Sequence, residues 1–367
     1  MPGKQKKKSA LSVSGGVEQP GPINPQAVRQ LKKVVKRPHG TSQLLEGIRS
    51  GDISMLGQAI TLAESTLESH QHTAQELIMA CLPYSGNAFR VGITGVPGAG
   101  KSTFIESLGK HIIEQGGRLA VLAIDPSSER SGGSILGDKT RMEFLAGSKA
   151  AFIRPSPSGG TLGGVARKTR ESVILCEAAG FDTIFVETVG VGQSETAVHR
   201  MVDFFLLVML AGAGDELQGI KRGIMEMADA IVINKADGTN IRKARRAQAE
   251  FANALHLFPP APSGWTPRVE TCSSLYHQGI REIWDLATEY RAFVSGNGYL
   301  KAKRLEQSRY WLYETLREGI YNQVFSDPDT VRELEAYEKA ISEGRITSFM
   351  AASSILNKYK SGKKSSR

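Results

Sequence analysis

The sequence GVPGAGKS, residues 95–102, matches GxxxxGK(S/T), the pattern of a phosphate-binding loop. It lies between the apolar run RVGIT, which favours a strand, and TFIESLGKHIIEQ, which favours a helix. Gly95, Gly98 and Gly100 allow backbone amides to turn inward around phosphate oxygens, and the helix N-terminus adds the positive end of its dipole. We expect Lys101 to bridge the β- and γ-phosphates of a nucleotide and the Ser102 hydroxyl to bind Mg²⁺.

Short apolar runs rich in β-branched residues follow one another from Phe89 onward, separated by helical segments or loops. Continuous runs of this kind suit strands that are buried on both faces, as in a parallel sheet covered by helices. We therefore expect an α/β fold with a mainly parallel sheet. Its strands should include these runs: RVGIT, RLAVLAID, AAFIRP, TIFVET, DFFLLVML, AIVINKAD and PRVETCSS.

The formal net charge of +9 arises from 46 Lys and Arg residues against 37 Asp and Glu residues. Much of this excess stands at the two ends of the chain, among Ser and Gly. Aromatic residues make up only 7% of the chain, and none lies in the N-terminal tail. A nucleic-acid site would need aromatic side chains near the charges, so we predict solvated tails and no nucleic-acid partner.

Only three cysteines occur, at Cys81, Cys176 and Cys272, and they are far apart in the sequence. They form neither a disulfide framework nor a CxxC metal site, which favours a reducing compartment. The longest strongly apolar run, 204–211, is much shorter than the ~20 residues that span a bilayer. We expect a cytoplasmic protein with no membrane partner.

The sequence NKAD, Asn234–Asp237, follows the apolar run AIVI and matches NKxD, the pattern with which GTPases recognise guanine. The Asp237 carboxylate can accept hydrogen bonds from the guanine N1–H and the exocyclic amine, whereas adenine offers no such pair of donors. Asn234 and the aliphatic stem of Lys235 are expected to brace the loop and the base. Downstream of a phosphate-binding loop, this motif favours GTP over ATP.

The segment TCSSL, residues 271–275, follows the next predicted strand. GTPases place a backbone amide against the guanine O6 atom at this point. Ser273, Ser274 and Leu275 are therefore candidates for the base site, and an ordinary turn at the end of a strand is the alternative.

The segment FVETVGVGQSE contains Glu187 at the end of an apolar run. A carboxylate here can hold water on Mg²⁺, and the Gly190 amide can reach the γ-phosphate. Val191 stands where Ras-like proteins carry the glutamine that orients the attacking water, so we expect slow hydrolysis without a partner. Gln193 is an alternative residue for that role.

Two further loops carry charged residues at the ends of predicted strands. Asp125 and Asp138 are candidates for Mg²⁺ or switch carboxylates, with capping and turn formation as the alternative. In the loop AGAGDELQGIKRG, a cation could neutralise charge that develops on the transferred phosphoryl group, and a solvated charged loop is the alternative. The polar residues of this loop are Asp215, Glu216, Gln218, Lys221 and Arg222.

Taken together, these motifs resemble the MeaB/ArgK/MMAA family, the P-loop G-protein chaperones of adenosylcobalamin-dependent methylmalonyl-CoA mutases. The resemblance runs from about Thr41 into the C-terminal helical segments. The motifs that carry it, in family order, are GVPGAGKST, AIDPSS, GSILGDKTRM, ETVGVGQSE, AGAGDELQGIK and NKAD.

The resemblance implies a SIMIBI-type P-loop NTPase that binds GTP or GDP with Mg²⁺ and holds no covalently bound cofactor. The expected phosphate site consists of Gly95, Val96, Pro97, Gly98, Ala99, Gly100, Lys101, Ser102 and Thr103. The expected base site consists of Asn234, Lys235, Asp237, Ser273, Ser274 and Leu275. The expected metal-linked residues are Ser102, Asp125, Asp138 and Glu187. The expected catalytic residues are Lys101, Asp125, Glu187, Gln218 and Lys221.

The resemblance also implies a domain organisation and partners. We expect a GTPase domain over 87–292 after a helical extension over 39–86, and a C-terminal helical arm over 293–360 that forms a homodimer. Basic tails are expected over 1–38 and 361–367. The expected partner is methylmalonyl-CoA mutase or a related adenosylcobalamin mutase, whose cofactor loading the GTPase would gate and which it would protect or reactivate.

Three other functions stay open from the sequence. They are a small-molecule kinase of the arginine or ornithine type, a metal-delivery GTPase, and an adaptor that binds GTP without hydrolysis. A kinase needs an acceptor pocket and a base, which no motif marks. Metal delivery needs clustered His or Cys ligands, but His70 and His72 are the only close pair. The valine at position 191 is compatible with the adaptor.

Overall fold

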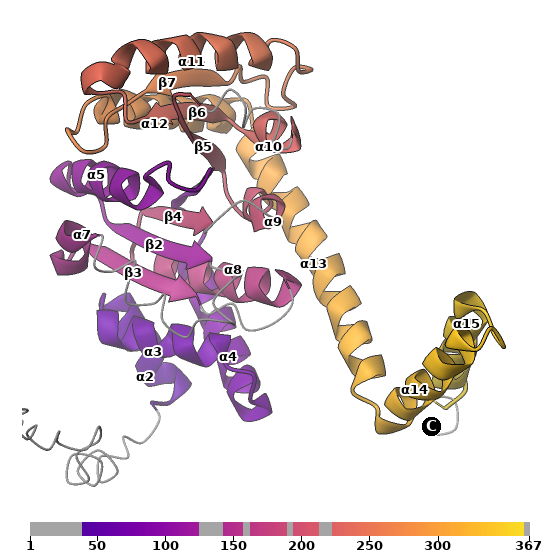
Figure 1. Cartoon of the computed structure of the whole chain (residues 1–367). Coiled ribbons are helices and arrows are strands. Elements are labelled where there is room, and N and C mark those ends of the chain that lie inside the picture. The colour runs from indigo at the N-terminus through magenta and orange to yellow at the C-terminus, as the bar shows by residue number, and fades with distance from the viewer. Residues whose placement is uncertain (1–38, 125–141, 157–161, 189–193, 213–221, 363–367) are drawn as a thin grey trace, which may run out of the picture. The chain divides into compact units, whose positions relative to one another are not determined.

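The computed structural model describes residues 39–124, 142–156, 162–188, 194–212 and 222–362, and in these ranges seven parallel strands form one sheet (Figure 1). The strands are β1 (Phe89–Gly95), β2 (Leu119–Ile124), β3 (Ala151–Ser156), β4 (Thr183–Thr188), β5 (Phe204–Leu210), β6 (Ala230–Asn234) and β7 (Arg268–Thr271). Their order across the sheet is β3-β2-β4-β1-β5-β6-β7. Each apolar run expected to form a strand does so, which confirms the parallel α/β fold.

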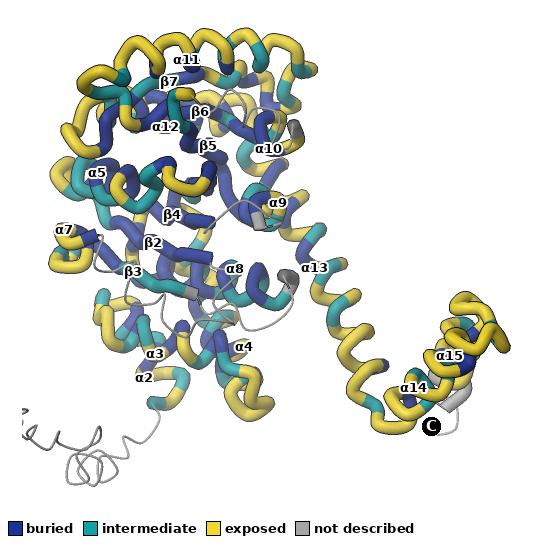
Figure 2. Tube along the Cα trace, viewed as in Figure 1, coloured by how far each residue is buried: buried dark blue, intermediate teal, exposed yellow. Residues whose placement is uncertain are grey.

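The central strands owe their sequences to burial on both faces. Every residue of β2 and β4 is buried, and Figure 2 shows these strands as dark blue tubes among helices with exposed outer sides. A strand with two covered faces is apolar at successive positions rather than at alternate ones. The runs LAVLAI and TIFVET are therefore continuous, and they carry few polar residues apart from those at the ends of the strands.

In the described residues, three helices and a short 3₁₀ turn precede β1. The helices pack against one another, and all three also pack against α8. Asp52 fixes the start of the second helix, because its Oδ1 accepts hydrogen bonds from the amides of Ser54, at 2.7 Å, and Met55, at 3.2 Å. These elements are α2 (Thr41–Arg49), α3 (Ile53–Glu64), α4 (Glu68–Cys81) and η1 (Leu82–Tyr84).

Helices connect the strands, and further helices follow the last strand. Between the strands lie α5 (Lys101–Glu114), α7 (Glu143–Gly147), α8 (Leu162–Ala178), α9 (Ser194–His199), α10 (Arg222–Met227), η2 (Gly238–Asn240) and α11 (Ile241–Leu255). After β7 come α12 (Ile280–Gly296), α13 (Tyr299–Phe325), α14 (Pro328–Ser342) and α15 (Ser348–Gly362). The C-terminal part is helical, as expected, while the domain boundaries given above stay a prediction. No helix in the described ranges is long and apolar enough to cross a membrane.

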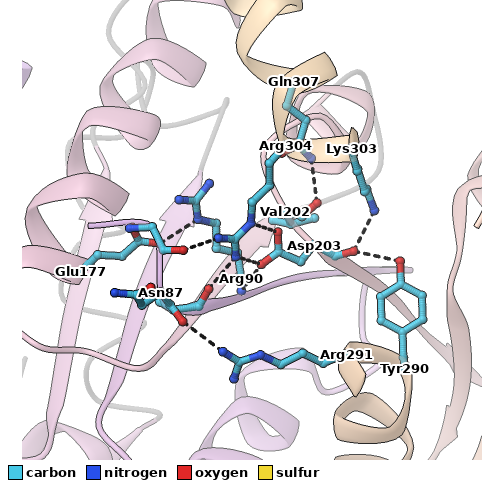
Figure 3. Close-up of polar contacts among 12 residues, drawn as sticks. Asn87, Arg90, Glu177, Val202, Asp203, Tyr290, Arg291, Lys303, Arg304 and Gln307 are labelled. Carbon is cyan, nitrogen blue, oxygen red and sulfur yellow. Dashed lines mark hydrogen bonds and ion pairs between the residues drawn. The ribbon is translucent and has the colours of Figure 1, made fainter. Parts of the chain in front are cut away.

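A fully buried aspartate, Asp203, anchors α13 to the start of β5 (Figure 3). Its carboxylate accepts hydrogen bonds from Arg304 Nε, at 2.8 Å, and from the Arg90 amide, at 3.0 Å. Its carbonyl oxygen accepts from the Tyr290 hydroxyl at 3.1 Å and from Lys303 Nζ at 2.7 Å. The buried carboxylate is therefore balanced by a guanidinium and a backbone amide, and Asp203 as a whole accepts hydrogen bonds from β1, α12 and α13.

The same face of α13 continues this attachment at intervals of four residues. Gln307 Nε2 donates to the Val202 carbonyl at 2.8 Å, and Trp311 Nε1 donates to the Arg200 carbonyl at 2.9 Å. Residues four apart lie on one side of a helix, so a single face of α13 meets the chain between α9 and β5. The first half of α13 is thus part of the packed core.

Candidate functional site

The predicted phosphate loop connects β1 to α5, with Val96 to Gly100 between the two elements. Gly95 lies so close to β5 that a Cβ atom there would stand 2.0 Å from the Val208 carbonyl oxygen. Gly100 has φ +81° immediately before the first turn of α5, a conformation that side chains other than glycine rarely adopt. Both glycines are therefore required by the backbone geometry, and the loop presents the N-terminus of α5 as an anion site.

Lys101 is the first residue of α5, and its ammonium returns to the start of the loop. Nζ donates a hydrogen bond to the Gly95 carbonyl at 2.9 Å. Burial holds the pKa of Lys101 below its usual value, and the nearby carboxylates of Glu187 and Glu195 oppose part of this shift. The two acidic residues thus favour the charged form of the lysine, which is the form that phosphate binding requires.

The carboxyl end of β4 lies beside this loop. Glu187 is buried there, and in the sheet it is in register with Ile93 of β1 and Ala123 of β2. The next residue, Thr188, donates from Oγ1 to Thr94 Oγ1 at 2.8 Å, and both threonines are fully buried. This hydrogen bond ties the end of β4 to the end of β1, directly before the phosphate loop.

Asn234, the last residue of β6, joins the phosphate loop to the predicted base site. Its Nδ2 donates to the Ala99 carbonyl at 2.8 Å. Its Oδ1 accepts from the Ser274 amide at 3.1 Å and from the Ser274 hydroxyl at 2.8 Å. The Cys272 thiol also donates to Oδ1 at 3.3 Å, and burial raises the pKa of this thiol to about 12. The asparagine therefore holds three loops together with both ends of one amide group.

Asp237 and Ser273, both predicted base-site residues, are in direct contact. The Ser273 hydroxyl donates a hydrogen bond to Asp237 Oδ2. Ala236 and Cys272, which lie next to these two residues, are linked by a hydrogen bond of 2.9 Å from the Ala236 amide to the Cys272 carbonyl. Lys235 adopts φ +59°, and its Cε would lie 3.7 Å from a Cβ atom at Gly100, so the lysine stem runs beside the phosphate loop.

The three candidate amides after β7 differ in what they bind. The Ser273 amide donates to the Gln278 carbonyl at 3.0 Å, and the Ser274 amide donates to Asn234. The Leu275 amide has no acceptor among the residues that the structure describes. Of the three, Leu275 is therefore the best candidate for a hydrogen bond to guanine O6.

Several predicted residues lie outside the described ranges. They are Asp125, Asp138, Gly190, Val191, Gln193, Asp215, Glu216, Gln218 and Lys221. The roles assigned to them from the sequence stay predictions. The described part of the site consists of the phosphate loop, Glu187, and the loops that contain Asn234, Asp237 and Leu275.

Other residues of the site were not singled out from the sequence, although Thr188 and Glu195 stand in ETVGVGQSE and Cys272 stands in TCSSL. Thr94, Thr188 and Cys272 belong to apolar runs, where they look like ordinary strand residues. Glu195 is buried on α9 and acts on Lys101 through charge. The one sequence feature that could have indicated them is a polar side chain at the end of an otherwise apolar strand. This feature does not identify the residue that the side chain contacts.

The described residues suit a nucleoside triphosphate with Mg²⁺. The loop leaves no room for a Cβ atom at Gly95, a helix N-terminus follows it, and a partly buried lysine lies against it. The Ser102 hydroxyl and the Glu187 carboxylate provide oxygen donors, which Mg²⁺ prefers. By contrast, the described ranges contain no group of three or more His, Cys, Asp or Glu residues that could hold a metal ion by themselves.

The pair considered for metal delivery has structural contacts instead. His70 Nδ1 lies 2.9 Å from the Ser65 hydroxyl, and His72 Nδ1 lies 3.5 Å from Glu76 Oε1. Both histidines are exposed on α4. They contact neighbours on their own helix and the residues just before it.

Comparison with known proteins agrees with this site. The family described as methylmalonyl-CoA mutase-associated GTPase MeaB matches residues 56–329. GTPase ArgK of Escherichia coli is 49% identical over 288 residues, which cover 78% of this chain and 87% of that protein. The Mus musculus methylmalonic aciduria type A homolog, mitochondrial, is 45% identical over 329 residues, which cover 87% of this chain and 79% of that protein.

A solved structure supports the same assignment. The crystal structure of an LAO/AO transport system kinase has a TM-score of 0.71 and 39% sequence identity, and the match covers 87% of this chain and 97% of that one. The family match extends over the phosphate loop, β4 and both base-site loops. The chain therefore belongs to the methylmalonyl-CoA mutase-associated GTPase MeaB family.

Proposed function

We propose that this chain hydrolyses GTP to GDP and phosphate in an Mg²⁺-dependent reaction, and that its nucleotide state controls an adenosylcobalamin-dependent methylmalonyl-CoA mutase. The observation that carries the nucleotide part is the Asn234 side chain, which binds the phosphate loop through Nδ2 and the loop after β7 through Oδ1. This arrangement sets the phosphate and base subsites at a fixed separation. The mutase part rests on the family and on the name of the mouse relative.

Each described residue has a distinct part in this proposal. Lys101 offsets the negative charge of the phosphates, and Ser102 and Glu187 hold Mg²⁺, which neutralises charge on the phosphate oxygens. Asp237 accepts the two hydrogen bonds that guanine offers at its N1 and amino positions, and the Leu275 amide meets O6. With valine at position 191, the chain lacks the usual water-orienting glutamine, which favours slow turnover that a partner completes.

The slow turnover of GTP would act as a timer for the mutase. In the GTP state the protein would hold the mutase in a form that accepts adenosylcobalamin, and hydrolysis would release it. The same cycle would protect the mutase or restore it after inactivation. An incomplete catalytic site suits such a role, because GTP is then hydrolysed mainly when the mutase is bound.

GTP turnover measured with and without a methylmalonyl-CoA mutase from the same organism tests the proposal. We expect acceleration of at least ~10-fold by the mutase, since a stabilising group supplied in trans contributes 10³–10⁵-fold in other GTPases. An adenosylcobalamin enzyme of another class serves as the control and should leave the rate unchanged. If the mutase does not change the rate of GTP turnover, it is not the partner, although the proposal of GTP hydrolysis would still stand.

Three further measurements separate the other functions. A phosphorylated product from arginine, ornithine or another small acceptor would support a kinase instead. If bound GTP persists for many hours in single-turnover conditions, even with the mutase present, the chain is an adaptor without hydrolysis. A tight transition-metal site in a metal titration would support metal delivery.

We also propose that the C-terminal helices form a homodimer. Leu312, Leu316 and Ile320 recur at intervals of four residues on α13, and each is more than half exposed. Exposed leucine and isoleucine side chains at this spacing make an apolar stripe, which is typical of a helix that packs against another helix. A second copy of the same helix offers an identical stripe, so a symmetric dimer would cover both.

Changing Leu316 to lysine tests this interface. A charge in the middle of the stripe should shift the protein from dimer to monomer and weaken self-association by at least ~10-fold, because the buried lysine would lack a partner. Sedimentation velocity over a range of concentrations measures the change. Leu257→Lys alters an even more exposed leucine outside α13 and should leave the dimer intact. A dimer that is equally stable in both variants would exclude this stripe as the interface.

A further inference from the structure

A hydrogen bond joins α5 to the turn that follows β7. Ser107 Oγ lies 2.6 Å from His277 Nδ1, although the two residues are 170 positions apart in the sequence. Ser107 is almost fully buried, while His277 is exposed. Neither residue belongs to the phosphate or base motifs, so neither has a part in the function derived above.

The turn that contains His277 is closely constrained. Ser273 and Gln278 exchange two backbone hydrogen bonds of 3.0 Å, which close the turn around Ser274 to His277. His277 adopts φ +54°, and Lys235 is the only other non-glycine residue with positive φ in the described ranges. Left-handed conformations at residues other than glycine cost energy and tend to occur at functional sites. Here both lie in the two loops of the proposed base site.

The helix α5 connects this contact to the proposed phosphate site. Its first residue, Lys101, belongs to the phosphate site, and Ser107 lies less than two turns further along the same helix. Leu275 lies two residues before His277 in the closed turn, and its amide is the candidate donor to guanine O6. One helix thus carries the lysine of the proposed phosphate site at its N-terminus and contacts the turn of the proposed base site through Ser107.

We propose that the Ser107–His277 hydrogen bond positions the Leu275 amide for guanine recognition, so that both residues determine nucleotide specificity without touching the nucleotide. Asn234 fixes the start of the turn through Ser274, and Ser107 fixes its other end through His277. Without the second contact, the side of the turn that carries His277 keeps only the backbone hydrogen bonds between Ser273 and Gln278. This inference rests on the proposed GTP site and assigns two positioning residues to it.

Two single substitutions remove the contact in different ways. Ser107→Ala deletes the hydroxyl on α5, and His277→Gly deletes the imidazole while keeping a residue that adopts positive φ without strain. His277→Asn is the conservative variant, because asparagine tolerates positive φ and carries a polar side-chain atom near the position of Nδ1. His111→Ala is the matched control. It also removes an imidazole, but His111 lies on α5 and its partner is Gln115 at the end of the same helix.

Binding of three diphosphates to the purified full chain distinguishes positioning from general loosening. 6-Thio-GDP changes only the acceptor at position 6, and IDP lacks only the 2-amino group that Asp237 recognises. We expect wild-type protein to prefer GDP over 6-thio-GDP by ~10-fold, the value of about one hydrogen bond. In Ser107→Ala and His277→Gly this preference should fall to ~3-fold or less, while the preference for GDP over IDP stays within ~2-fold of wild type.

The remaining variants and the double mutant have distinct expected results. His277→Asn should retain most of the preference at position 6, His111→Ala should match wild type, and Ser107→Ala combined with His277→Gly should be no worse than either alone. If the single variants weaken GDP, IDP and 6-thio-GDP equally, or leave all three unchanged, the positioning role is wrong. If wild-type protein does not prefer GDP over ADP, the proposed guanine site itself fails, which is a separate result.

Discussion

Replacing Lys101 with alanine should abolish GTP turnover and weaken GTP binding by at least ~100-fold. The partly buried Lys101 ammonium lies against the phosphate loop, where it donates to the Gly95 carbonyl at 2.9 Å. In a site with little water, one preorganised donor to a developing negative charge contributes ~10²–10³-fold to the rate. Removing this cation leaves the β- and γ-phosphate charges without their main counter-charge from the protein.

Steady-state GTP hydrolysis and nucleotide binding by calorimetry measure this effect. Lys110→Ala serves as the matched control, because Lys110 lies on the same helix and contacts only residues outside the proposed site: it pairs with Glu114 at 3.9 Å and lies over the Phe144 ring. That variant should bind and hydrolyse GTP as the wild type does. Normal turnover by Lys101→Ala would mean that the GxxxxGK(S/T) loop is not the phosphate site of this protein.

Changing Asp237 to asparagine should convert the protein from a guanine binder to a xanthine binder. The carboxylate accepts two hydrogen bonds from guanine in the proposed site, and a hydrogen bond to a charged group contributes about 1.5–3 kcal/mol. Losing both predicts a decrease in GDP affinity of ~10²-fold or more. Xanthine has a carbonyl where guanine has an amine, so the asparagine amide can donate to it.

The xanthine nucleotide supplies the internal control for this variant. Asp237→Asn should bind XDP more tightly than GDP, and the wild type should show the opposite order. The Ser273 hydroxyl can still donate to the asparagine oxygen, as it does to Asp237 Oδ2, so the loop should keep its structure. An unchanged order of preference would remove Asp237 from base recognition, even if overall affinity fell.

The elements of the fold could be predicted from the sequence because they depend on local patterns. All seven strands coincide with apolar runs, since a strand with two covered faces needs continuous apolar sequence. The phosphate loop was equally recognisable, because inward-facing amides require glycine at set positions before a helix. NKAD and TCSSL, read after strands, indicated two base-site loops, and the structure brings Asp237 and Ser273 into contact.

The choice among similar residues required the tertiary structure. From the sequence, Ser273, Ser274 and Leu275 were equivalent candidates for the amide at guanine O6. The structure separates them, because Gln278 and Asn234 accept hydrogen bonds from the first two amides. The sequence also assigned Asn234 a general bracing role, and only the fold shows that its two amide atoms connect the phosphate loop to the loop after β7.

The sequence by itself thus determined the strands, the phosphate loop and the base motif, each of which follows from short-range spacing. The tertiary structure alone decided which distant residues meet: Thr94 with Thr188, Asp203 with Arg304, and Ser107 with His277. The physical reason is that these pairs depend on the order and register of the strands. Parallel neighbours such as β1 and β5 are far apart in the chain, and no local periodicity records which strands become neighbours.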